Sequence, residues 1–352
     1  MKNKAYAAQS ATSSLTPISI ERRQARETDV VIDILYCGIC HSDIHCARNE
    51  WHSTRYPCVP GHEIVGRVSA VGNKVKNYKV GDVVGVGCLV GSCNDCAACD
   101  EGLEQYCDNG FTGTYNSADK IGGTSHKVTL GGYSDSITVD ESFVLRIPDN
   151  LDLAASAPLL CAGITTYSAL KHWKVGKGQK VGIIGLGGLG HMGVKLAHAM
   201  GATVVMITTS AEKGKDARQL GADEVLVSTD AQAMKSEQNS FDFLLNTIPV
   251  GHDVDPYMAL LKRDATMVIV GAIEPLKKVN GISFIFRRRN MAGSLIGGLA
   301  QTQEMLDFCG KHNITCDIEK VAIQDVNTAY DRTVKGDVKY RFVIDMASLK
   351  GE

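Results

Sequence analysis

The distribution of hydrophobic positions divides the chain into two regions of different character. In the first 150 residues, dense β-branched runs at 29–36, 64–71 and 80–86 are bounded by glycine and asparagine, with no long helical segment between them. Short strands spaced in this way predict a partly open barrel or sandwich. The stretch 111–132, rich in glycine, threonine and serine, predicts a surface loop.

From residue 180 onward, short apolar runs alternate with helical segments. The run 181–184 is typical of a strand buried on both faces of a parallel sheet. Leu189, Leu196 and Met200 then predict a helical stripe that faces this sheet. The repeated alternation predicts a doubly wound α/β fold. Further strands are expected at 203–207, 224–227, 241–246 and 265–270.

Two other parts of the chain have a weaker pattern. Residues 151–173 are alanine-rich and predict helical structure around Cys161. After residue 301, the pattern predicts a helix, a strand, a second helix and a second strand. These elements are expected at 303–311, 321–323, 327–334 and 340–344.

The composition is that of an ordinary globular protein: 352 residues, 44% hydrophobic and 22% charged, with a formal net charge of −2. Such a charge gives no electrostatic reason to expect nucleic acid or an anionic membrane as partner. Three arginines at 287–289 are interpreted as a solvated corner. No apolar run approaches the roughly 20 residues that span a bilayer, and no apolar segment of a secretory signal follows the basic N-terminus. We therefore expect a cytoplasmic protein that binds neither nucleic acid nor membrane.

Four of the twelve cysteines lie close together in the sequence. Cys93, Cys96, Cys99 and Cys107 have the spacing C-x2-C-x2-C-x7-C. Four thiolates so close can enclose one zinc with no position left for chemistry, which predicts a structural zinc lobe at about 88–110. An iron–sulfur cluster or four free thiols are the alternatives; the ferredoxin pattern, however, requires proline where this chain has Asp108.

A second set of zinc donors lies between Cys40 and Glu63. Cys40 is followed by Ser42 and His45, and His62 precedes Glu63 directly. Thiolate and neutral imidazole are the usual zinc donors, and two of them leave room for a third ligand and a reactant. Cys40 and His62 are therefore predicted to hold a catalytic zinc. Taken singly, they would be interpreted as a buried thiol and a core histidine.

The turn after the strand 181–184 reads Gly185-Leu186-Gly187-Gly188-Leu189-Gly190, a G-x-G-x-x-G motif. It follows a strand, opens a helix and is succeeded by another strand, which is the context that a dinucleotide site requires. Its glycines allow backbone N–H groups to approach a pyrophosphate at the helix N-terminus. A purely structural glycine turn is the alternative.

The residues after the next strand indicate which dinucleotide is bound. An NAD site usually carries Asp or Glu there, whereas this chain has Thr209 and Ser210, followed by Lys213. A carboxylate would repel a 2′-phosphate, but hydroxyls and a lysine can hold it. The sequence therefore predicts NADP(H) with these three residues as contacts. The alternative is that Lys213 is a solvated surface charge.

The stretch from Gly61 to Gly66, with Gly72 and Val75, resembles the zinc signature of the medium-chain alcohol dehydrogenases, G-H-E-x-x-G-x-x-x-x-x-G-x-x-V, at every fixed position. The resemblance covers nearly the whole chain. The segments Cys-His-Ser-Asp, Pro-Leu-Leu-Cys-Ala-Gly-Ile-Thr and Asp-Val-Lys-Tyr-Arg-Phe resemble the cinnamyl-alcohol-dehydrogenase-like, NADP-dependent branch. They lie at 40–43, 158–165 and 337–342.

The resemblance implies an α/β protein with a β-rich GroES-like catalytic domain and a doubly wound Rossmann domain. Residues 1–150 and 297–352 would form the catalytic domain, and residues 151–296 the NADP-binding domain. It further implies two zinc ions per subunit, a homodimer, and reversible hydride transfer between NADP(H) and primary alcohols or aldehydes. Aromatic substrates such as cinnamyl or benzyl compounds, or medium aliphatic ones, are expected.

The resemblance also assigns roles to particular residues. Cys161 becomes the third ligand of the catalytic zinc, and Ser42 and His45 become a path for the proton. Ser42 could instead be a helix N-cap. Glu63 is expected to orient the site or to coordinate zinc when the substrate position is empty. Further cofactor contacts are expected at Thr165, Val270, Gly271, Ala272, Ser294, Ile296 and Arg341, and the pocket walls at Trp51, Cys88 and Ile296.

Three other functions remain as alternatives. An NAD-dependent zinc polyol dehydrogenase would carry an acidic residue after the second Rossmann strand, and a zinc-free quinone reductase would lack Cys40 and His62. A non-catalytic protein that binds NADPH and zinc would have no need of the Ser42 and His45 pair. The sequence favours the dehydrogenase.

Overall fold

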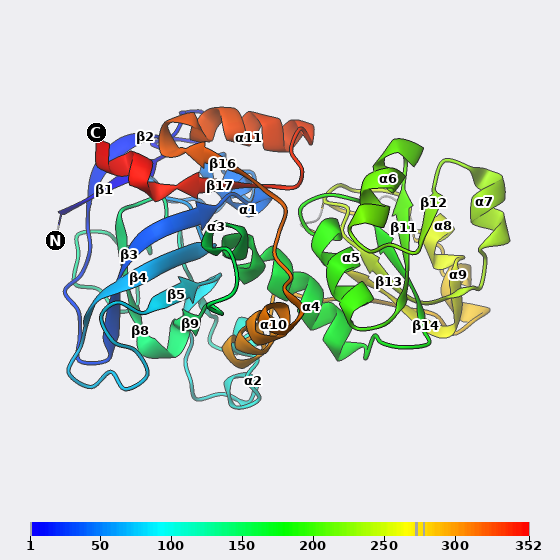
Figure 1. The fold of residues 1–352 in the computed structure, drawn as a ribbon, viewed down its shortest axis with the longest axis horizontal. Coiled ribbons are helices and arrows are strands. Elements are labelled where there is room, and N and C mark those ends of the chain that lie inside the picture. The colour runs from blue at the N-terminus through cyan, green and yellow to red at the C-terminus, as the bar shows by residue number, and fades with distance from the viewer. Residues whose placement is uncertain (1, 272–273, 277–278, 352) are drawn as a thin grey trace. The chain divides into compact units, whose positions relative to one another are not determined.

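A computed structural model describes residues 2–271, 274–276 and 279–351. The chain forms two compact units, one of residues Met1–Cys161 and Gly297–Glu352 and the other of residues Ala162–Ile296. The second boundary between the units falls after Ile296. The first lies after Cys161 rather than at residue 150, so that residues 151–161 belong to the first unit (Figure 1).

The first unit is built on a mainly antiparallel sheet of strand order β16-β17-β3-β4-β5-β9, with β8 also paired to β3. The long strand β3 (Asp29–Gly38) pairs with β4 (Ile64–Val71), where Val30 lies opposite Val71 and Cys37 opposite Ile64. The other strands are β1 (Lys2–Ala7), β2 (Thr16–Glu21), β5 (Val83–Val86), β6 (Leu89–Gly91), β7 (Thr112–Gly113), β8 (Ser136–Asp140), β9 (Leu145–Arg146), β16 (Ile318–Ala322) and β17 (Arg341–Asp345).

Helices and 3-10 turns connect the strands of this unit. The last two strands of the chain, β16 and β17, belong to the same sheet. The strand β17 pairs antiparallel with β3, so residues near the C-terminus lie beside those that lead to the predicted metal site. The helices are α1 (His41–Ala47), α2 (Ala97–Asp100), α3 (Leu153–Ser156), α10 (Leu299–His312) and α11 (Val326–Lys335). The 3-10 turns are η1 (Glu104–Tyr106), η2 (Glu141–Phe143), η3 (Ala157–Leu160), η4 (Ile323–Asp325) and η5 (Met346–Gly351).

The second unit is a doubly wound α/β fold, as the sequence predicts. All five strand pairs of its sheet are parallel, in the order β12-β11-β10-β13-β14-β15. The strands are β10 (Lys180–Ile184), β11 (Thr203–Thr208), β12 (Glu224–Val227), β13 (Phe241–Asn246), β14 (Leu261–Ile269) and β15 (Asn290–Gly293). The helices are α4 (Ala162–His172), α5 (Gly190–Ala199), α6 (Ala211–Gln219), α7 (Ala231–Ser236), α8 (Asp255–Met258) and α9 (Ile282–Ile285).

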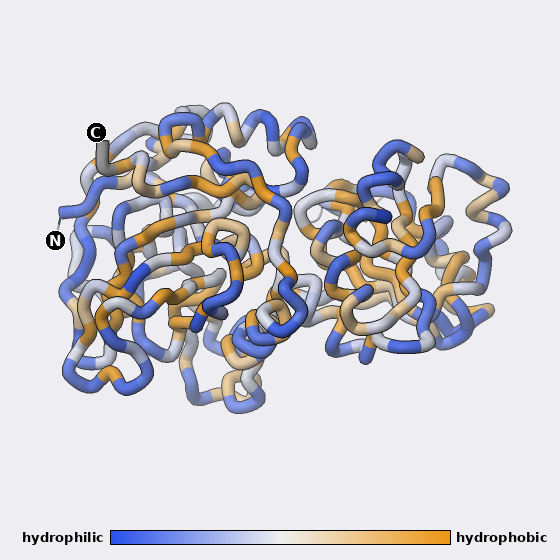
Figure 2. The backbone as a smooth tube through the Cα atoms, viewed as in Figure 1, coloured by the Kyte–Doolittle hydropathy of each residue, from blue (hydrophilic) through white to orange (hydrophobic). Residues whose placement is uncertain are grey.

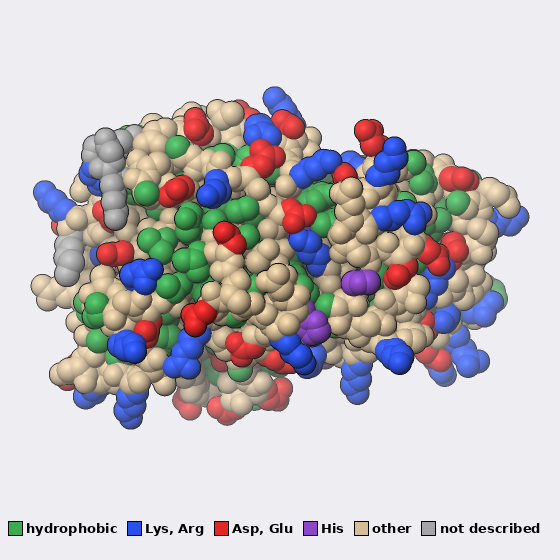
Figure 3. Space-filling view, in the orientation of Figure 1, with side chains coloured by type: hydrophobic (Ala, Val, Ile, Leu, Met, Phe, Trp, Pro, Cys, Tyr) green, Lys and Arg blue, Asp and Glu red, His purple; other side chains and the backbone are tan. Residues whose placement is uncertain are grey.

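The strand β10 lies inside this sheet and is buried on both faces, which explains its uninterrupted apolar run. Val181, Ile183 and Ile184 are at most 1% exposed. Hydrophobic stretches follow the strands, while hydrophilic ones dominate the outer helices and loops (Figure 2). Acidic and basic side chains are interspersed on the face drawn in Figure 3, in keeping with the small net charge.

Two sequence predictions need correction. The helical stripe of α5 contains Leu196, which is buried, but Leu189 and Met200 are half-buried residues that flank the helix. The strand expected at 80–86 begins only at Val83, because residues 80–82 form the turn before it. The segment 151–173 is helical, as the sequence predicts, and is divided into α3, η3 and α4 with a break at Cys161, where the backbone leaves helical geometry (φ −131°, ψ −67°).

Among the described residues, no single helix is long and apolar enough to cross a membrane. One bent pair, Leu153–Leu160 with Ala162–His172, meets that requirement by length and composition only.

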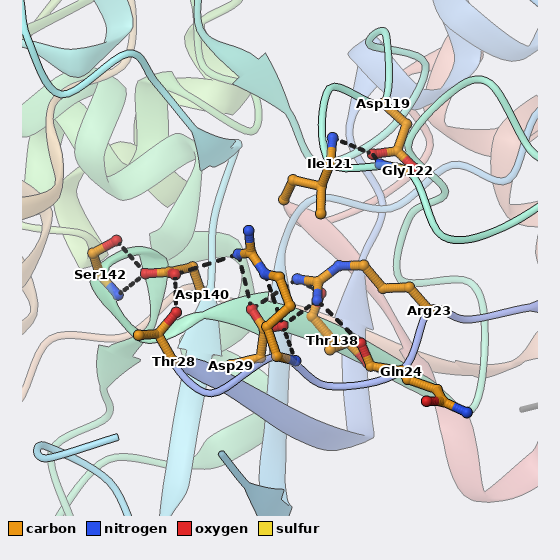
Figure 4. A network of polar contacts seen from close by, with 11 residues as sticks. Arg23, Gln24, Thr28, Asp29, Asp119, Ile121, Gly122, Thr138, Asp140 and Ser142 are labelled. Carbon is orange, nitrogen blue, oxygen red and sulfur yellow. Dashed lines mark hydrogen bonds and ion pairs between the residues drawn. The ribbon is translucent and has the colours of Figure 1, made fainter. Parts of the chain in front are cut away.

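A buried carboxylate, that of Asp29, anchors the start of β3. Arg23 pairs with it through both terminal nitrogens, and the backbone N–H of Arg26 donates to its Oδ2 at 2.6 Å (Figure 4). The neighbouring Asp140 accepts from Thr28 at 2.7 Å and from Ser142 at 2.7 Å. Burial alone would raise the pKa of Asp29, but the hydrogen bonds from Arg23 and Arg26 outweigh it and lower the pKa well below its usual range.

We expect Asp29→Asn to lower the free energy of unfolding by about 3–5 kcal/mol at neutral pH, because it leaves the Arg23 guanidinium without a counter-charge. A carboxyl with a depressed folded-state pKa stabilises the fold above its unfolded-state pKa of about 3.9 and loses that contribution as the pH falls further. The difference between wild type and variant should therefore shrink below about pH 4.

Urea unfolding across this pH range measures the effect. The matched control is Asp331→Asn, which removes an exposed pair with Arg48 and should cost less than about 1 kcal/mol. Equal losses for the two variants would contradict the role given to Asp29.

Candidate active site and metal centres

The helix α1 positions the first thiol of the site. Cys40 is its N-cap residue, and the Asp43 carboxylate accepts the Cys40 backbone N–H at 2.9 Å, which fixes the start of the helix. A hydrogen bond from Cys161 lowers the pKa of Cys40 well below its usual value despite burial, and the charge of Arg341 acts in the same direction. Cys40 is thereby held in the thiolate form, which is the form that binds metal.

The same carboxylate orients His62, which lies just before β4. The Nδ1–H of His62 donates to Asp43 Oδ1 at 3.0 Å, which leaves Nε2 free for a metal. The N–H of Gly61 donates to the same oxygen at 3.0 Å. Gly61 has a φ of +103°, and a Cβ there would lie 2.7 Å from the Tyr133 ring, so glycine is required at this turn.

Glu63 is fully buried and ion-paired with Arg341, whose own side chain is 6% exposed. Its Oε1 accepts from Arg341 Nη2, while its Oε2 is buried with no hydrogen-bond partner in the part of the chain that the structure describes. Burial raises the pKa of Glu63 to about 7, although Arg341 opposes the shift. A buried oxygen without a donor is costly unless it has another partner, and a cation would be one.

Cys161 completes this cluster from the break between η3 and α4. One donor atom each of Cys40, His62, Glu63 and Cys161 lies within 4.8 Å of the others. Two thiolates, a neutral imidazole and a carboxylate form a donor set that zinc binds in proteins. The charges also fit, because three negative groups would be balanced by a divalent ion and the Arg341 guanidinium. These residues are therefore suited to hold zinc.

The second cluster lies around α2, where Cys93, Cys96, Cys99 and Cys107 have their Sγ atoms within 4.8 Å of one another. The Sγ atoms of Cys93 and Cys99 are 3.9 Å apart. A tetrahedral site with Zn–S bonds of about 2.3 Å places its sulfurs about 3.8 Å apart, so the observed spacing fits zinc. The backbone N–H groups of Cys93 and Asp108 point to the sulfurs of Cys107 and Cys96 at 3.4 Å, as expected around thiolates.

Ser42 and His45 lie on one face of α1, three residues apart. The Ser42 hydroxyl is 3.7 Å from Cys40 Sγ, which places it beside the metal cluster. His45 is partly exposed, contacts Glu50 through Nδ1, and its ring lies 5.4 Å from that of Trp51. The alternative that Ser42 is the N-cap is wrong, because Cys40 occupies that position.

The predicted nucleotide turn has the expected backbone. Gly185 has a φ of +92°, and a Cβ on Gly190 would overlap the Gly185 carbonyl, so both positions require glycine. A Cβ on Gly187 would meet no atom within 4 Å, so there is open space at this glycine through which a phosphate could approach. Gly188 and Leu189 complete the turn, and Leu189 is the N-cap of α5.

The proposed contacts for the 2′-phosphate follow β11. Thr209 and Lys213 are exposed, and Ser210 is the half-buried N-cap of α6. The other predicted nucleotide contacts are dispersed: Thr165 is buried on α4, Gly271 is buried, and Val270, Ser294 and Ile296 are half-buried, while Arg341 belongs to the first unit. Ala272 lies outside the described residues.

The expected pocket walls do not form one group within a single unit. Trp51 is 50% exposed beside His45, and Cys88 is half-buried with its Sγ 3.8 Å from the Leu160 carbonyl. Both belong to the first unit, whereas Ile296 belongs to the second. Their role as a pocket stays a prediction.

Two residues of this site were not identified by the sequence analysis. Asp43 lies three residues after Cys40, the capping-box position, and that spacing was a usable signal. Tyr115 has its ring 5.5 Å from that of His62 and lies within the predicted surface loop 111–132. That prediction is wrong in part, because Thr112, Thr114 and Leu130 are buried. The many small polar residues of the segment gave no signal of this packing.

Comparison with known proteins agrees with both halves of this arrangement. Residues 26–149 match the alcohol dehydrogenase GroES-like domain family, and residues 188–311 match the zinc-binding dehydrogenase family. The chain is 56% identical over 353 residues to "Aldehyde reductase YahK" of Escherichia coli, covering 99% of both chains. It is 51% identical over 347 residues to "NADP-dependent alcohol dehydrogenase C 1" of Mycolicibacterium smegmatis, covering 98% of both chains.

A solved structure gives the same result. The cinnamyl alcohol dehydrogenase of Helicobacter pylori, complexed with NADP(H), superposes with a TM-score of 0.91 at 43% identity and covers 99% of both chains. The superposition spans both the β-rich unit and the doubly wound unit of the chain.

We expect Asp43→Asn to weaken zinc binding at the Cys40 cluster by about 10- to 100-fold, because the amide cannot accept from Cys40, Gly61 and His62 at once. The measurement is zinc content per subunit after dialysis against graded chelator. The four-cysteine cluster should keep its zinc. Asp331→Asn, an exposed carboxylate in the same unit, is the control, and equal zinc retention in the two variants would contradict the role of Asp43.

Proposed function

Because the chain belongs to the zinc-containing medium-chain alcohol dehydrogenase family, in its NADP-dependent, cinnamyl-alcohol-dehydrogenase-like branch, we propose that it interconverts primary alcohols and aldehydes at the Cys40 cluster. It is an NADP-dependent alcohol dehydrogenase or aldehyde reductase with two zinc sites. The observation that carries the assignment of the site is the convergence of Cys40, His62, Glu63 and Cys161 on one point, with an unpaired oxygen on Glu63.

Each bound group supplies one part of the chemistry. Zinc provides a Lewis acid toward an alcohol or carbonyl oxygen, and NADP(H) accepts or donates the hydride. The chain's own residues hold the metal, shield it from water and move the proton. Ser42 lies beside Cys40, and His45 is exposed enough to exchange a proton with solvent. We propose that the proton travels from the substrate oxygen through Ser42 to His45.

The substrate class is part of the proposal. Aromatic aldehydes such as cinnamaldehyde and benzaldehyde, and medium aliphatic ones, fit the aromatic character of Trp51 and Tyr115 near the cluster. The names of the relatives support the same class, since they include an aldehyde reductase and a cinnamyl alcohol dehydrogenase. An NAD-dependent polyol dehydrogenase and a non-catalytic protein are less well supported by the same comparisons.

The decisive test combines metal analysis with turnover. We expect two zinc ions per subunit and NADPH-dependent reduction of cinnamaldehyde or benzaldehyde in the wild type. Cys161→Ala should retain one zinc and lose at least about a hundredfold in turnover, because catalytic metal stabilisation is worth several kcal/mol. Cys309→Ala, a buried cysteine of α10 outside both clusters, is the control. Full turnover in Cys161→Ala would end the proposal.

We propose that Thr209, Ser210 and Lys213 contact the 2′-phosphate of NADP(H). Two of them are exposed, and Ser210 is the N-cap of α6, where its side chain makes no capping hydrogen bond and could bind an anion. Ser210→Asp should raise the KM for NADPH at least about tenfold, or about 1.4 kcal/mol, and leave that for NADH nearly unchanged. Ser236→Asp, at an exposed serine of α7, is the control. An unmutated protein that uses NADH as well as NADPH would contradict this assignment.

We further propose a homodimer formed through the edge of the six-stranded sheet. The strand β15 lies at that edge, and beside it Ile285 and Phe286 are 77% and 78% exposed. Light scattering should give twice the subunit mass for the wild type and the subunit mass for Ile285→Asp with Phe286→Asp. Val334→Asp, an exposed apolar position on α11, should stay dimeric. A monomeric wild type would contradict the proposal.

We also propose a reducing, cytoplasmic environment. None of the twelve cysteines, all of which lie among the described residues, forms a disulfide, and six of them belong to the two metal clusters that require thiolates.

A further inference from the structure

Two buried cysteines outside both metal clusters lie in direct contact. Cys46 is in the last turn of α1, and Cys58 lies in the extended segment that leads to His62. Their Sγ atoms are 3.7 Å apart, and the residues are 3% and 2% exposed. Cys58 is held in place by a pair of 2.9 Å backbone hydrogen bonds with Ala8. Neither cysteine has been given a role in the alcohol dehydrogenase reaction.

The surroundings give the two thiols different character. A hydrogen bond from Cys58 lowers the pKa of Cys46 although burial opposes it, and Thr54, 3.6 Å from Cys46 Sγ, acts in the same direction as Cys58. The hydrogen bond with Cys46 and burial both raise the pKa of Cys58. Cys46 is therefore the thiolate and nucleophile of the pair, and Cys58 carries the proton.

The segment that joins the two cysteines in the sequence lies largely at the surface. Residues 50–53, between the two cysteines, are exposed, and Asn49 and His52 take left-handed turns with φ of +53° and +57°. Such segments open locally at a lower cost than core strands do. A small oxidant can therefore reach the Cys46 sulfur without unfolding of the sheet.

We propose that Cys46 and Cys58 form a reversible disulfide when the protein meets hydrogen peroxide, and that this bond ties together the two segments that carry the metal ligands Cys40 and His62. The Cys46 thiolate attacks one peroxide oxygen, which breaks the O–O bond, releases hydroxide and leaves a sulfenic acid. The Cys58 sulfur then attacks the Cys46 sulfur, forming the S–S bond and breaking the S–O bond. The hydroxide from the first step takes the proton that Cys46 lost on becoming a thiolate, and the hydroxide from the second step takes the Cys58 proton. Two thiols lose two electrons and two protons, and the peroxide becomes two waters.

The bond would act on the metal site through the backbone. Disulfide formation brings the sulfurs from 3.7 Å to about 2.0 Å. Cys40 caps the helix that carries Cys46 in its last turn, and His62 follows Cys58 by four residues in the sequence. A covalent link between the two segments restricts the separation of Cys40 and His62 that zinc release requires.

The test treats the zinc-loaded, full-length enzyme with graded peroxide and maps disulfides by peptide mass spectrometry. We expect a Cys46–Cys58 linked peptide at peroxide concentrations that leave the zinc content intact, and its loss after dithiothreitol. In Cys58→Ser, Cys46 should instead be trapped as a sulfenic acid by a 1,3-dione reagent. Cys309→Ser should form the disulfide as the wild type does. Recovery of Cys46 and Cys58 as free thiols while the metal ligands oxidise would overturn the proposal.

A second measurement addresses the tie between the two segments. Zinc loss to a chelator from the Cys40 cluster should be several-fold slower in the oxidised wild type than in the reduced protein. Cys46→Ser, given the same peroxide treatment, should show no such change. Equal rates of zinc loss from the oxidised and the reduced wild type would show that the disulfide, even where it has formed, does not restrain the two segments.

Discussion

The buried carboxylate of Asp43 is the constraint on which the active-site arrangement depends. It accepts hydrogen bonds from the backbone N–H of Cys40, the N–H of Gly61 and the Nδ1–H of His62, at 2.9–3.0 Å. The first fixes the helix that presents a thiolate, and the others fix the turn that presents an imidazole. One side chain therefore sets the separation of two metal ligands and the tautomer of the histidine.

Charge balance accounts for the rest of the cluster. The thiolates of Cys40 and Cys161 and the carboxylate of Glu63 lie buried together, which would be unstable without compensation. Arg341, which begins β17 near the C-terminus, supplies one positive charge, and a divalent ion supplies the others. Its pairing with Glu63 gives this C-terminal residue a role in the metal site, whereas the sequence analysis expected it to contact the cofactor.

The chemistry is divided between the two units, and each unit uses a different physical means. The first holds metal with side chains drawn from α1, the turn before β4, and the break at Cys161. The second holds its cofactor with backbone geometry, through glycines at the end of a buried parallel strand. The ligands of the Cys40 cluster are distant from one another in the sequence, whereas a glycine turn is entirely local.

That difference explains what the sequence by itself determined. The glycine turn, the four-cysteine cluster and the strands 64–71, 224–227 and 241–246 were predicted at their observed positions, because each depends on neighbours within a few residues. Cys161 was identified as a zinc ligand only through the family resemblance. Asp43, Tyr115 and the Arg341–Glu63 pair were identified only in the tertiary structure. No periodicity encodes a contact between residue 63 and residue 341. The strand β3 pairs on one side with β17, which begins at Arg341, and on the other with β4, which follows Glu63. Folding alone makes that contact, because burial and charge pairing act between residues that are close in space, whatever their distance along the chain.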